Sequence, residues 1–279
     1  RLHMVSGFPV GLIDASVGGT TVEAWTSRNK LKEIDGAQPL IEEWNKKINN
    51  YDAEISLNEK IKRWEKDSER RKERGEKPNP KPTKPDLDPA NDRNNPGASY
   101  NAMIAPISGL NISGTVFNQG YNNALGNARP SLYRKTFQAM IESWRKAFRN
   151  PKMPFCVIGL TAGGQPQTQE NFELRTVDPG PYIREAQHLA TKSLEFAEFL
   201  PAYDQQVPWY HPHKKFELGE RAARWAMNTV LGHQRIGWKP VELISAEKNG
   251  DHFVLTFDRA VRVHDGRPFA GFSISGSDK

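Results

Sequence analysis

Two adjacent glycines, Gly18 and Gly19, could offer backbone N–H groups to a ligand. They follow the short apolar run Val10, Leu12 and Ile13, which is typical of a strand buried on both faces. Glycine lets the backbone turn sharply and lets a ligand approach its N–H groups closely. The carboxyl end of a parallel strand is also where open α/β sheets place their sites. The pair therefore marks a candidate site, although a plain strand-to-helix turn has the same pattern.

A polar loop at residues 118–123 carries side-chain amides of the kind that stabilise a developing negative charge. The loop follows a short segment, residues 113–117, that we expect to be a strand. Gln119 and Asn122 are its candidate donors. A capped turn without catalytic chemistry has the same composition, so both interpretations stay open.

A histidine far along the chain, His211, is the candidate base. It precedes Pro212 and lies just ahead of a helix expected to begin near Phe216. In such a loop an imidazole can reach into a cleft and take up a proton. A loop histidine is commonly a surface residue, which is how we interpret the neighbouring His213.

These residues need a scaffold that carries strand ends to one edge, and the periodicity of the chain predicts one. Residues 155–160 are the clearest buried strand, and Thr20 is expected to cap a short helix through Trp25. Amphipathic helices are expected over residues 132–148, 182–200 and 216–231. Alternating strands and helices predict a parallel α/β sheet with helices on both faces.

The two ends of the sequence have patterns of their own. The first residues are typical of the last turn of a helix closed by Gly7. From Val241 onward apolar and polar residues alternate, and Asn249-Gly250 predicts a hairpin turn, so we expect an antiparallel β unit. A domain rarely begins in the last turn of a helix, and the β unit stops abruptly. We therefore expect the chain to be a segment of a longer polypeptide.

Residues 30–97 are predicted to form a helical and proline-rich insertion. Ile41, Trp44 and Ile48 recur at helical spacing, and Asn49-Asn50 offers a break that would turn one long helix into a helical hairpin. The prolines between residues 78 and 89 predict an extended return. Its many charges alone would suggest an interaction protein, but such runs are usually solvated faces.

Composition excludes several classes of function. The 279 residues suffice for one α/β domain and a smaller unit. The net charge of +6 comes largely from the mixed-sign run at residues 60–84 rather than from a basic stripe, so we expect no nucleic-acid partner. No segment is apolar enough to span a membrane, and no cluster of ligands indicates a metal. The glycine-rich segments lack nucleotide-binding motifs. The single Cys156 is expected to be buried and inert.

Four stretches of the sequence together resemble one known family. They are residues 11–27, 100–106, 114–124 and 211–215. In this order they resemble the sialate O-acetylesterases, a branch of the SGNH (GDSL-like) hydrolases, over nearly the whole chain. The resemblance implies an SGNH-hydrolase-like (flavodoxin-like) fold. It also implies an esterase domain at 1–29 and 98–236, the insertion at 30–97, and the start of a β-sandwich-like accessory unit at 237–279.

The resemblance implies a serine-hydrolase mechanism that removes acetyl esters from sugars. His211 would be the base, and Gly18, Gly19, Gln119 and Asn122 would bind the oxyanion or substrate. No metal or organic cofactor is implied. The serine of the family lies in a Gly-Gln-Ser-Asn motif that these residues lack, so we expect it in an upstream segment of the same polypeptide. The substrate would be an O-acetylated carbohydrate, and the family habit suggests a secreted or periplasmic protein.

The sequence departs from the family at two positions. Trp209 stands where the family has the aspartate that orients the histidine, and Tyr121 stands where it has a glutamate. Asp204 is the candidate replacement for the orienting carboxylate. The alternative hypothesis is a catalytically impaired relative that binds glycans or acts as a scaffold, with Trp209 and Tyr121 stacking on sugars. A Gly-Gln-Ser motif upstream would favour the esterase, and its absence would favour the binding protein.

Overall fold

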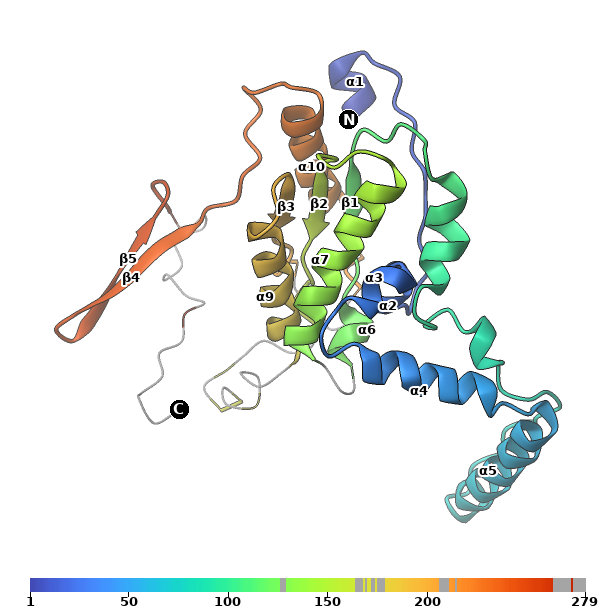
Figure 1. The fold of residues 1–279 in the computed structure, drawn as a ribbon. Coiled ribbons are helices and arrows are strands. Elements are labelled where there is room, and N and C mark those ends of the chain that lie inside the picture. Colours follow the sequence, from blue (N-terminus) through green and yellow to red (C-terminus); the bar gives the residue numbers. More distant parts are fainter. Residues whose placement is uncertain are drawn as a thin grey trace. The chain divides into compact units, whose positions relative to one another are not determined.

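Three parallel strands form the centre of the first of two compact units in the computed structural model (Figure 1). They are β1 (Thr115–Phe117), β2 (Phe155–Ile158) and β3 (Ala197–Leu200), and they lie in the order β1-β2-β3. The structure describes residues 1–125, 129–163, 168, 170–171, 174, 179–205, 211–213, 215–262 and 272. The mixed α/β architecture with a parallel sheet confirms the coarse prediction of fold class.

Helices follow the strands in the sequence and cover them. α7 (Pro130–Ala147) lies between β1 and β2, α9 (Pro179–Lys192) lies between β2 and β3, and α10 (Phe216–Trp225) follows β3. α10 continues as the π-helix η4 (Ala226–Val230). The other helices are α1 (Leu2–Ser6), α2 (Val22–Trp25), α3 (Arg28–Lys32), α4 (Gln38–Asn49), α5 (Ala53–Glu73), η1 (Pro89–Asn91), η2 (Tyr100–Ile104), η3 (Ala105–Ile107) and α6 (Tyr121–Ala124).

The two faces of the sheet bury different clusters. Successive strand residues point to opposite faces, and β2 follows this rule. Val157 belongs to the main core with residues of α2, α7 and α9, whereas Ile158 packs against Leu218 of α10. Both faces are therefore covered by helices, as the sequence predicts for a parallel sheet.

Aromatic side chains fill the main core beneath β1. Phe117 lies 5.4 Å from Phe137, 5.9 Å from Trp144 and 5.9 Å from Phe155, measured between ring centroids. Trp144 also donates from Nε1 to the carbonyl oxygen of Trp25 at 2.9 Å, which ties α7 to α2. The predicted apolar face of this helix is confirmed, and α2 is held firmly against it.

The strand predicted at residues 10–13 is wrong. These residues belong to neither helix nor strand, and the side chains of Leu12 and Ile13 are 88% and 54% exposed. An apolar run forms a buried strand only when neighbouring strands cover it. The described residues supply no such neighbour.

Two other details differ from prediction. The helix expected over 182–200 ends at Lys192, and its last residues form strand β3. Phe196, with a φ of 57°, directly precedes this strand of four residues, which is too short to show a helical or strand period. The amphipathic helix expected from Phe216 buries Leu218 and Trp225 on α10, while Phe216 itself is exposed.

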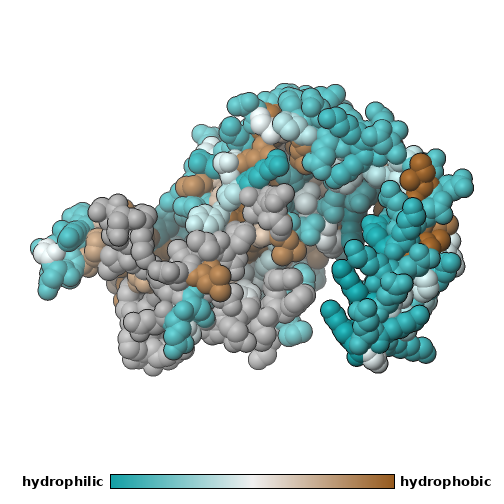
Figure 2. All heavy atoms as spheres, turned by 90° about the horizontal axis from the view of Figure 1, so that it is seen from below, coloured by the Kyte–Doolittle hydropathy of each residue, from teal (hydrophilic) through white to brown (hydrophobic). Residues whose placement is uncertain are grey.

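The insertion is two helices followed by an extended return. α4 ends at Asn49 and α5 begins at Ala53, so of the two alternatives, one long helix or a break near Asn49-Asn50, the structure has the break. The return lies along α5, because Trp64 Nε1 donates to the Asn79 carbonyl at 2.7 Å and Tyr51 Oη to the Asp86 carbonyl at 2.7 Å. Figure 2 shows a predominantly hydrophilic surface over α5, as expected for a solvated face.

The second unit, Trp238–Lys279, contains an antiparallel hairpin. β4 (Leu243–Asn249) pairs with β5 (His252–Phe257), so the hairpin predicted near Asn249-Gly250 is present, with Gly250 and Asp251 as the residues that connect the strands. At the other end of the chain, Gly7 closes α1 in a left-handed conformation with φ of 72°, which confirms the predicted helix cap. Cys156 is buried, and burial raises the pKa of its thiol, as expected of an inert residue.

Candidate active site

The loop at Gly18-Gly19 is held by its carbonyl and leaves its N–H groups available. The Gly19 carbonyl accepts from Asn94 Nδ2 at 3.0 Å and from Asn122 Nδ2 at 2.8 Å. Gly19 has a φ of 72°, a conformation that favours glycine. Neither the Gly18 nor the Gly19 N–H donates to another described residue, and both glycines are exposed. A negatively charged atom could therefore bind here without displacing a hydrogen bond.

The helix after this loop begins one residue later than predicted. Thr21, not Thr20, occupies the N-cap position of α2. Thr20 Oγ1 instead accepts from Trp25 Nε1 at 2.8 Å and donates to the Val17 carbonyl at 2.8 Å. The first N–H of α2, on Val22, donates to Asn123 Oδ1 at 2.9 Å. Asn123, which is distant in the sequence, therefore caps α2 in place of Thr20.

Four amide side chains, Asn94, Gln119, Asn122 and Asn123, surround the Gly19 loop, and we call them the amide cluster. Gln119 Nε2 donates to the Thr20 carbonyl and to Asn123 Oδ1, each at 2.8 Å. The amides predicted to bind an oxyanion therefore lie together, and in this structure they hold the loop that carries the free N–H groups. Direct donation by Gln119 or Asn122 to a substrate stays a prediction.

A buried side chain of α9, Gln187, supports the amide cluster from below. Its Nε2 donates to the Gln119 carbonyl at 2.6 Å and to Tyr133 Oη at 3.0 Å, and its Oε1 accepts from the Leu160 N–H at 3.3 Å. Burial raises the pKa of the Tyr133 phenol, which keeps it neutral. Tyr133 in turn donates to Gln119 Oε1 at 3.3 Å. This network fixes the position of the loop after β1.

His211 lies beside the same loop and contacts Tyr121. The two rings are 5.7 Å apart between centroids and inclined by 67°. Tyr121 is anchored on its far side, where its hydroxyl bonds the Thr161 hydroxyl and accepts from the Thr161 N–H at 2.8 Å. The His211 side chain is exposed, and burial raises the pKa of Tyr121. Tyr121, which stands where the family has a glutamate, thus packs its ring against the candidate base His211.

Asp204, the predicted orienting carboxylate, is bound by Arg221 of α10. Arg221 Nη1 donates to Asp204 Oδ1 at 2.8 Å, and Nη2 donates to Oδ2 at 2.5 Å. The guanidinium hydrogen bonds hold the pKa of the Asp204 carboxyl below its usual value. Both carboxylate oxygens serve this ion pair. Trp209 lies outside the described residues.

Several residues of the site were not predicted from the sequence. Asn94 comes from the end of the insertion, and Arg93 beside it packs over Gly19, whose added Cβ would lie 3.3 Å from its guanidinium. Glu23 accepts from Asn123 Nδ2 at 3.0 Å.

The density of asparagines at residues 91–95 is a weak sequence signal for a loop that belongs to the site. Nothing in the sequence pointed to Gln187, which resembles any polar residue of an amphipathic helix.

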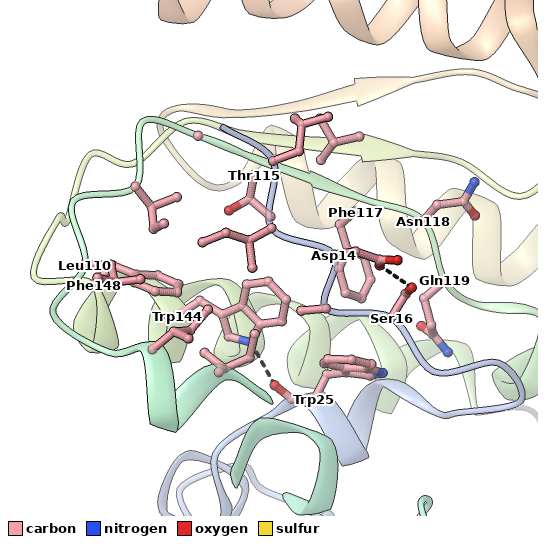
Figure 3. Close-up of a pocket in the computed structure, with 18 of the residues that line it drawn as sticks. Asp14, Ser16, Trp25, Leu110, Thr115, Phe117, Asn118, Gln119, Trp144 and Phe148 are labelled. Carbon is pink, nitrogen blue, oxygen red and sulfur yellow. Dashed lines mark hydrogen bonds between the residues drawn. The ribbon is translucent and has the colours of Figure 1, made fainter. Parts of the chain in front are cut away.

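Two cavities adjoin the site. The larger, about 1000 Å³, lies between residues 11–18 and residues 110–119, over Trp25 and Trp144 (Figure 3), and we call it the edge groove. Figure 3 shows Asp14 and Ser16, joined by a hydrogen bond, on one wall, with Phe117 on the β1 side.

The smaller cavity, about 250 Å³, is called the polar pocket. It adjoins the amide cluster at Asn122 and Asn123. Trp44 and Glu43 of α4, Glu23 of α2 and Arg129 also line it. A hydrogen bond from Lys47, with a weaker contribution from Arg129, lowers the pKa of the Glu43 carboxyl. The pocket thus combines one aromatic face with charged and amide groups.

Comparison with known proteins points in one direction. No family model matches the chain. The chain is 29% identical over 277 residues to a sialate O-acetylesterase of Rattus norvegicus and 31% identical over 285 residues to that of Mus musculus, covering 92% of this chain in each case. A human sialate O-acetylesterase is 26% identical over 80% of the chain. The chain resembles sialate O-acetylesterases.

The same similarity extends to a solved structure. A carbohydrate acetylesterase from Xanthomonas citri matches 92% of this chain with a TM-score of 0.63 and 22% sequence identity, which shows a common fold. The chain spans only 46% of the rat and mouse sialate O-acetylesterases and 45% of the bacterial structure. More than half of each of these proteins therefore has no counterpart in this chain.

Two further findings concern the described residues alone. None of their helices has the length and apolar character needed to span a bilayer. Their His, Cys, Asp and Glu side chains form no group of three that could ligate a metal ion.

Proposed function

We propose that this chain is part of a carbohydrate O-acetylesterase of the sialate O-acetylesterase family, with the esterase domain built on an SGNH-like sheet at residues 1–29 and 98–236. Similarity to several sialate O-acetylesterases over most of the chain supports the family, and the bacterial neighbour supports the fold. The observation that carries the proposal is the pair of N–H groups at Gly18 and Gly19 that donate to no described residue, in a loop held through the Gly19 carbonyl. Acyl transfer needs such preorganised donors for its oxyanion.

The proposed reaction uses a serine outside these 279 residues. Its oxygen attacks the acetyl carbonyl carbon while His211 takes up the hydroxyl proton. The N–H groups of Gly18 and Gly19, with Gln119 and Asn122 around them, stabilise the oxyanion. His211 then gives the proton to the sugar oxygen, which leaves, and water attacks the acetyl-serine in the same way to release acetate.

We assign the sugar portion of the substrate to the polar pocket. The pocket adjoins Asn122, and its half-buried Trp44 offers an apolar ring face of the kind that ligand pockets combine with a few polar groups. Arg129 adds a positive charge that suits an acidic sugar.

A pair of tryptophan variants tests this assignment. Trp44→Ala should lower kcat/KM for an O-acetylated sialic acid about tenfold, which corresponds to a loss of about 1.4 kcal/mol of contact with the sugar, and should leave hydrolysis of p-nitrophenyl acetate unchanged. Trp64→Ala, on the solvated α5, is the matched control. Equal loss on both substrates would contradict the assignment.

The second candidate function is a glycan-binding relative with impaired catalysis. The observation that favours it is the engagement of both Asp204 oxygens by Arg221, together with Trp209 in place of the aspartate of the family. Loss of the orienting carboxylate in a catalytic triad costs about 10⁴-fold in kcat.

Labelling with a fluorophosphonate distinguishes the two functions. The natural polypeptide that contains this chain should be labelled at a single serine and should release acetate from O-acetylated sugars. Labelling should depend on His211 and survive His213→Ala. If a known serine esterase reacts under the same conditions and this protein does not, the esterase proposal fails and sugar binding becomes the question.

A further inference from the structure

The positive charge of the chain is concentrated in one segment of the insertion. Residues 60–84, which we call the basic tip, contain 11 of the 39 Lys and Arg but only 5 of the 33 Asp and Glu. The excess of six equals the net charge of the whole chain, so the remaining residues are balanced. Charge that is placed so unevenly creates a local positive field that attracts anions. The basic tip is therefore a candidate surface for an anionic partner.

The packing of the main core does not account for the basic tip. Figure 1 shows α5 beyond the end of α4 that points away from the sheet. The structure describes every residue of α5, and only Ser68 is buried. By contrast, Ile41 of α4 belongs to a buried apolar cluster with Ala139 of α7. The insertion is thus anchored through α4, and α5 carries its charges into solvent.

The extended return gives the basic tip a fixed shape. The Asp86 N–H donates to Ser56 Oγ at 3.1 Å, and Lys60 Nζ donates to the Pro85 carbonyl at 3.3 Å. The Asp86 carboxylate also pairs with Lys60 and Arg63. The prolines of the return restrict the backbone further. A surface that is ordered before it meets a partner loses less conformational entropy on binding.

Folding sorts the mixed-sign sequence of α5 into two rows of like charge. Residues four apart lie on the same side of a helix, about 6 Å apart along its axis. One row, which we call the basic row, consists of Lys62, Lys66, Arg70 and, at the C-cap, Arg74. The acidic row beside it consists of Glu65, Glu69 and Glu73. All seven side chains are exposed.

The stability of the helix does not explain the basic row. Opposite charges four residues apart stabilise a helix, whereas like charges destabilise it. The ion pairs of α5 use Lys60, Arg63 and Arg71, and no member of the basic row forms an ion pair with a described residue. The helix dipole favours cations only in the last turn. It therefore leaves Lys62 and Lys66 without a structural role.

We propose that the basic row binds a single chain of an acidic polysaccharide. The Lys and Arg side chains would form charge-assisted hydrogen bonds with its carboxylate or sulfate groups. The choice of a carbohydrate rests on the proposed function, whereas the binding itself requires no esterase activity.

The acidic row favours a thin, sparsely charged partner over nucleic acid. Duplex DNA carries one negative charge about every 1.7 Å along its axis, on two strands, and would bring phosphates against the acidic row as well as the basic row. Stacking of single-stranded bases needs exposed aromatic rings. Trp64 is the only aromatic residue of α5, and its half-buried ring donates to the Asn79 carbonyl of the return. A single polysaccharide chain can instead lie along the basic row alone.

α4 connects the basic tip to the polar pocket. Leu40, Glu43 and Trp44 of α4 line this pocket, and α5 follows the C-terminal end of the same helix. A helix of 12 residues is about 18 Å long. A polymer held on the basic row therefore stays near the pocket, which raises its local concentration there.

Binding of polygalacturonate and dextran sulfate by the protein tests the proposal, with neutral dextran as the control. The triple variant Lys62→Gln, Lys66→Gln and Arg70→Gln should bind the acidic polymers about tenfold more weakly at 50 mM salt, and raising the salt to 200 mM should weaken wild-type binding about tenfold. Gln has nearly the helix propensity of Lys and Arg, so α5 stays folded, which circular dichroism checks. The matched variant Lys32→Gln, Lys135→Gln and Lys248→Gln removes the same charge from exposed positions outside the basic tip and should weaken binding less than about twofold.

The outcomes separate this proposal from its rivals. Binding of either acidic polymer that depends on the basic row supports it and tells whether carboxylate or sulfate is preferred. Equal weakening by the two triple variants overturns it, as does equal binding of neutral dextran or no binding of both acidic polymers. Tighter binding of duplex DNA or of phosphatidylserine vesicles, at the same salt and the same concentration of negative charge, would identify another partner and also overturns it. An active esterase that binds neither polymer loses only this proposal, whereas a protein that binds them and hydrolyses no ester loses only the proposed function.

Discussion

The two halves of the candidate active site are built differently. In one half, the Gly19 carbonyl, Gln119 and Gln187 are joined by hydrogen bonds of 2.6 to 3.0 Å that reach down to α7 and α9. In the other half, His211 is exposed and touches the Tyr121 ring, and Asp204 is bound to Arg221. Buried hydrogen bonds therefore hold the groups that could bind negative charge, whereas the candidate base is exposed to water.

The difference has a physical origin. The amide cluster stands on buried groups, where each unpaired donor or acceptor would cost roughly 1–3 kcal/mol, so its geometry is strongly enforced. The His211 side chain is exposed, so water competes for the hydrogen bonds of its imidazole. Variants of each half should therefore fail in different ways.

Removing the base should have the largest effect. His211→Ala should lower kcat of the natural polypeptide about 10²- to 10⁴-fold, which is the usual contribution of a general acid–base residue. The unfolding temperature should change little, because the side chain is exposed. Steady-state hydrolysis of p-nitrophenyl acetate measures this, with His213→Ala as the control. A fall of less than fivefold would remove His211 from the proposed mechanism.

Removing Gln187, which supports the amide cluster, should instead lower the free energy of unfolding. Gln187→Leu leaves the Leu160 N–H and the Gln119 carbonyl without their partner, so the free energy of unfolding should fall by about 2–3 kcal/mol. Urea denaturation measures this loss. Gln138→Leu, which removes a bond from α7 to the Ser193 hydroxyl near the surface, should cost less than about 1 kcal/mol. Equal losses would mean that the buried network is not what fixes the loop.

A smaller effect is expected when one of the two hydrogen bonds to the Gly19 carbonyl is removed. Asn122→Ala removes one of the two bonds to the Gly19 carbonyl and leaves that from Asn94, so kcat should fall about tenfold. Asn58→Ala on the exposed face of α5 is the control. A fall beyond about 100-fold would show that the Asn122 amide itself donates to the oxyanion, in the manner of a side-chain donor.

The smallest effect concerns the ion pair of the histidine half. The pKa of Asp204 is lowered in the folded chain, so its contribution to stability is present above the unfolded pKa of about 3.9 and is lost as pH falls through the folded pKa. Asp204→Asn should cost about 0.5–1 kcal/mol at pH 7, because the pair is partly exposed, and the difference from wild type should vanish at low pH. Thermal unfolding between pH 2 and 7 tests this, with Asp35→Asn, at an exposed position, as the control. We expect kcat to fall less than tenfold, and a fall near 10⁴-fold would restore Asp204 as the group that orients His211.

Local patterns predicted most of the fold. The apolar run of β2, the amphipathic face of α7 and the Asn249-Gly250 turn are each decided by neighbouring residues, and each is confirmed. The failures involve distant neighbours. Residues 10–13 have the composition of a buried strand, but no strand among the described residues covers them, and β3 is too short to show a period of its own.

The residues of the candidate site also fall into those that local sequence predicts and those that depend on distant partners. Gly19, Gln119 and Asn122 were predicted and lie together, because they follow strand or loop segments that meet at one edge. Asn94 and Gln187 were missed, since what makes them part of the site is a partner far away in the sequence. A polar residue in a loop or helix has no local feature that tells which carbonyl it will bind.

The bonds that clamp the Gly19 carbonyl have a consequence for the order of folding. Its two partners, Asn94 and Asn122, are 75 and 103 residues away along the chain. Contacts of such long range form only after the entropy of closing the intervening loops has been lost, and so they slow folding. The whole insertion must return, as the bond from the Gly97 N–H to the Glu23 carbonyl at 3.0 Å shows, before Asn94 can bind. We therefore expect the Gly18-Gly19 loop to reach its final conformation among the last steps of folding, well after α7 has packed against β2.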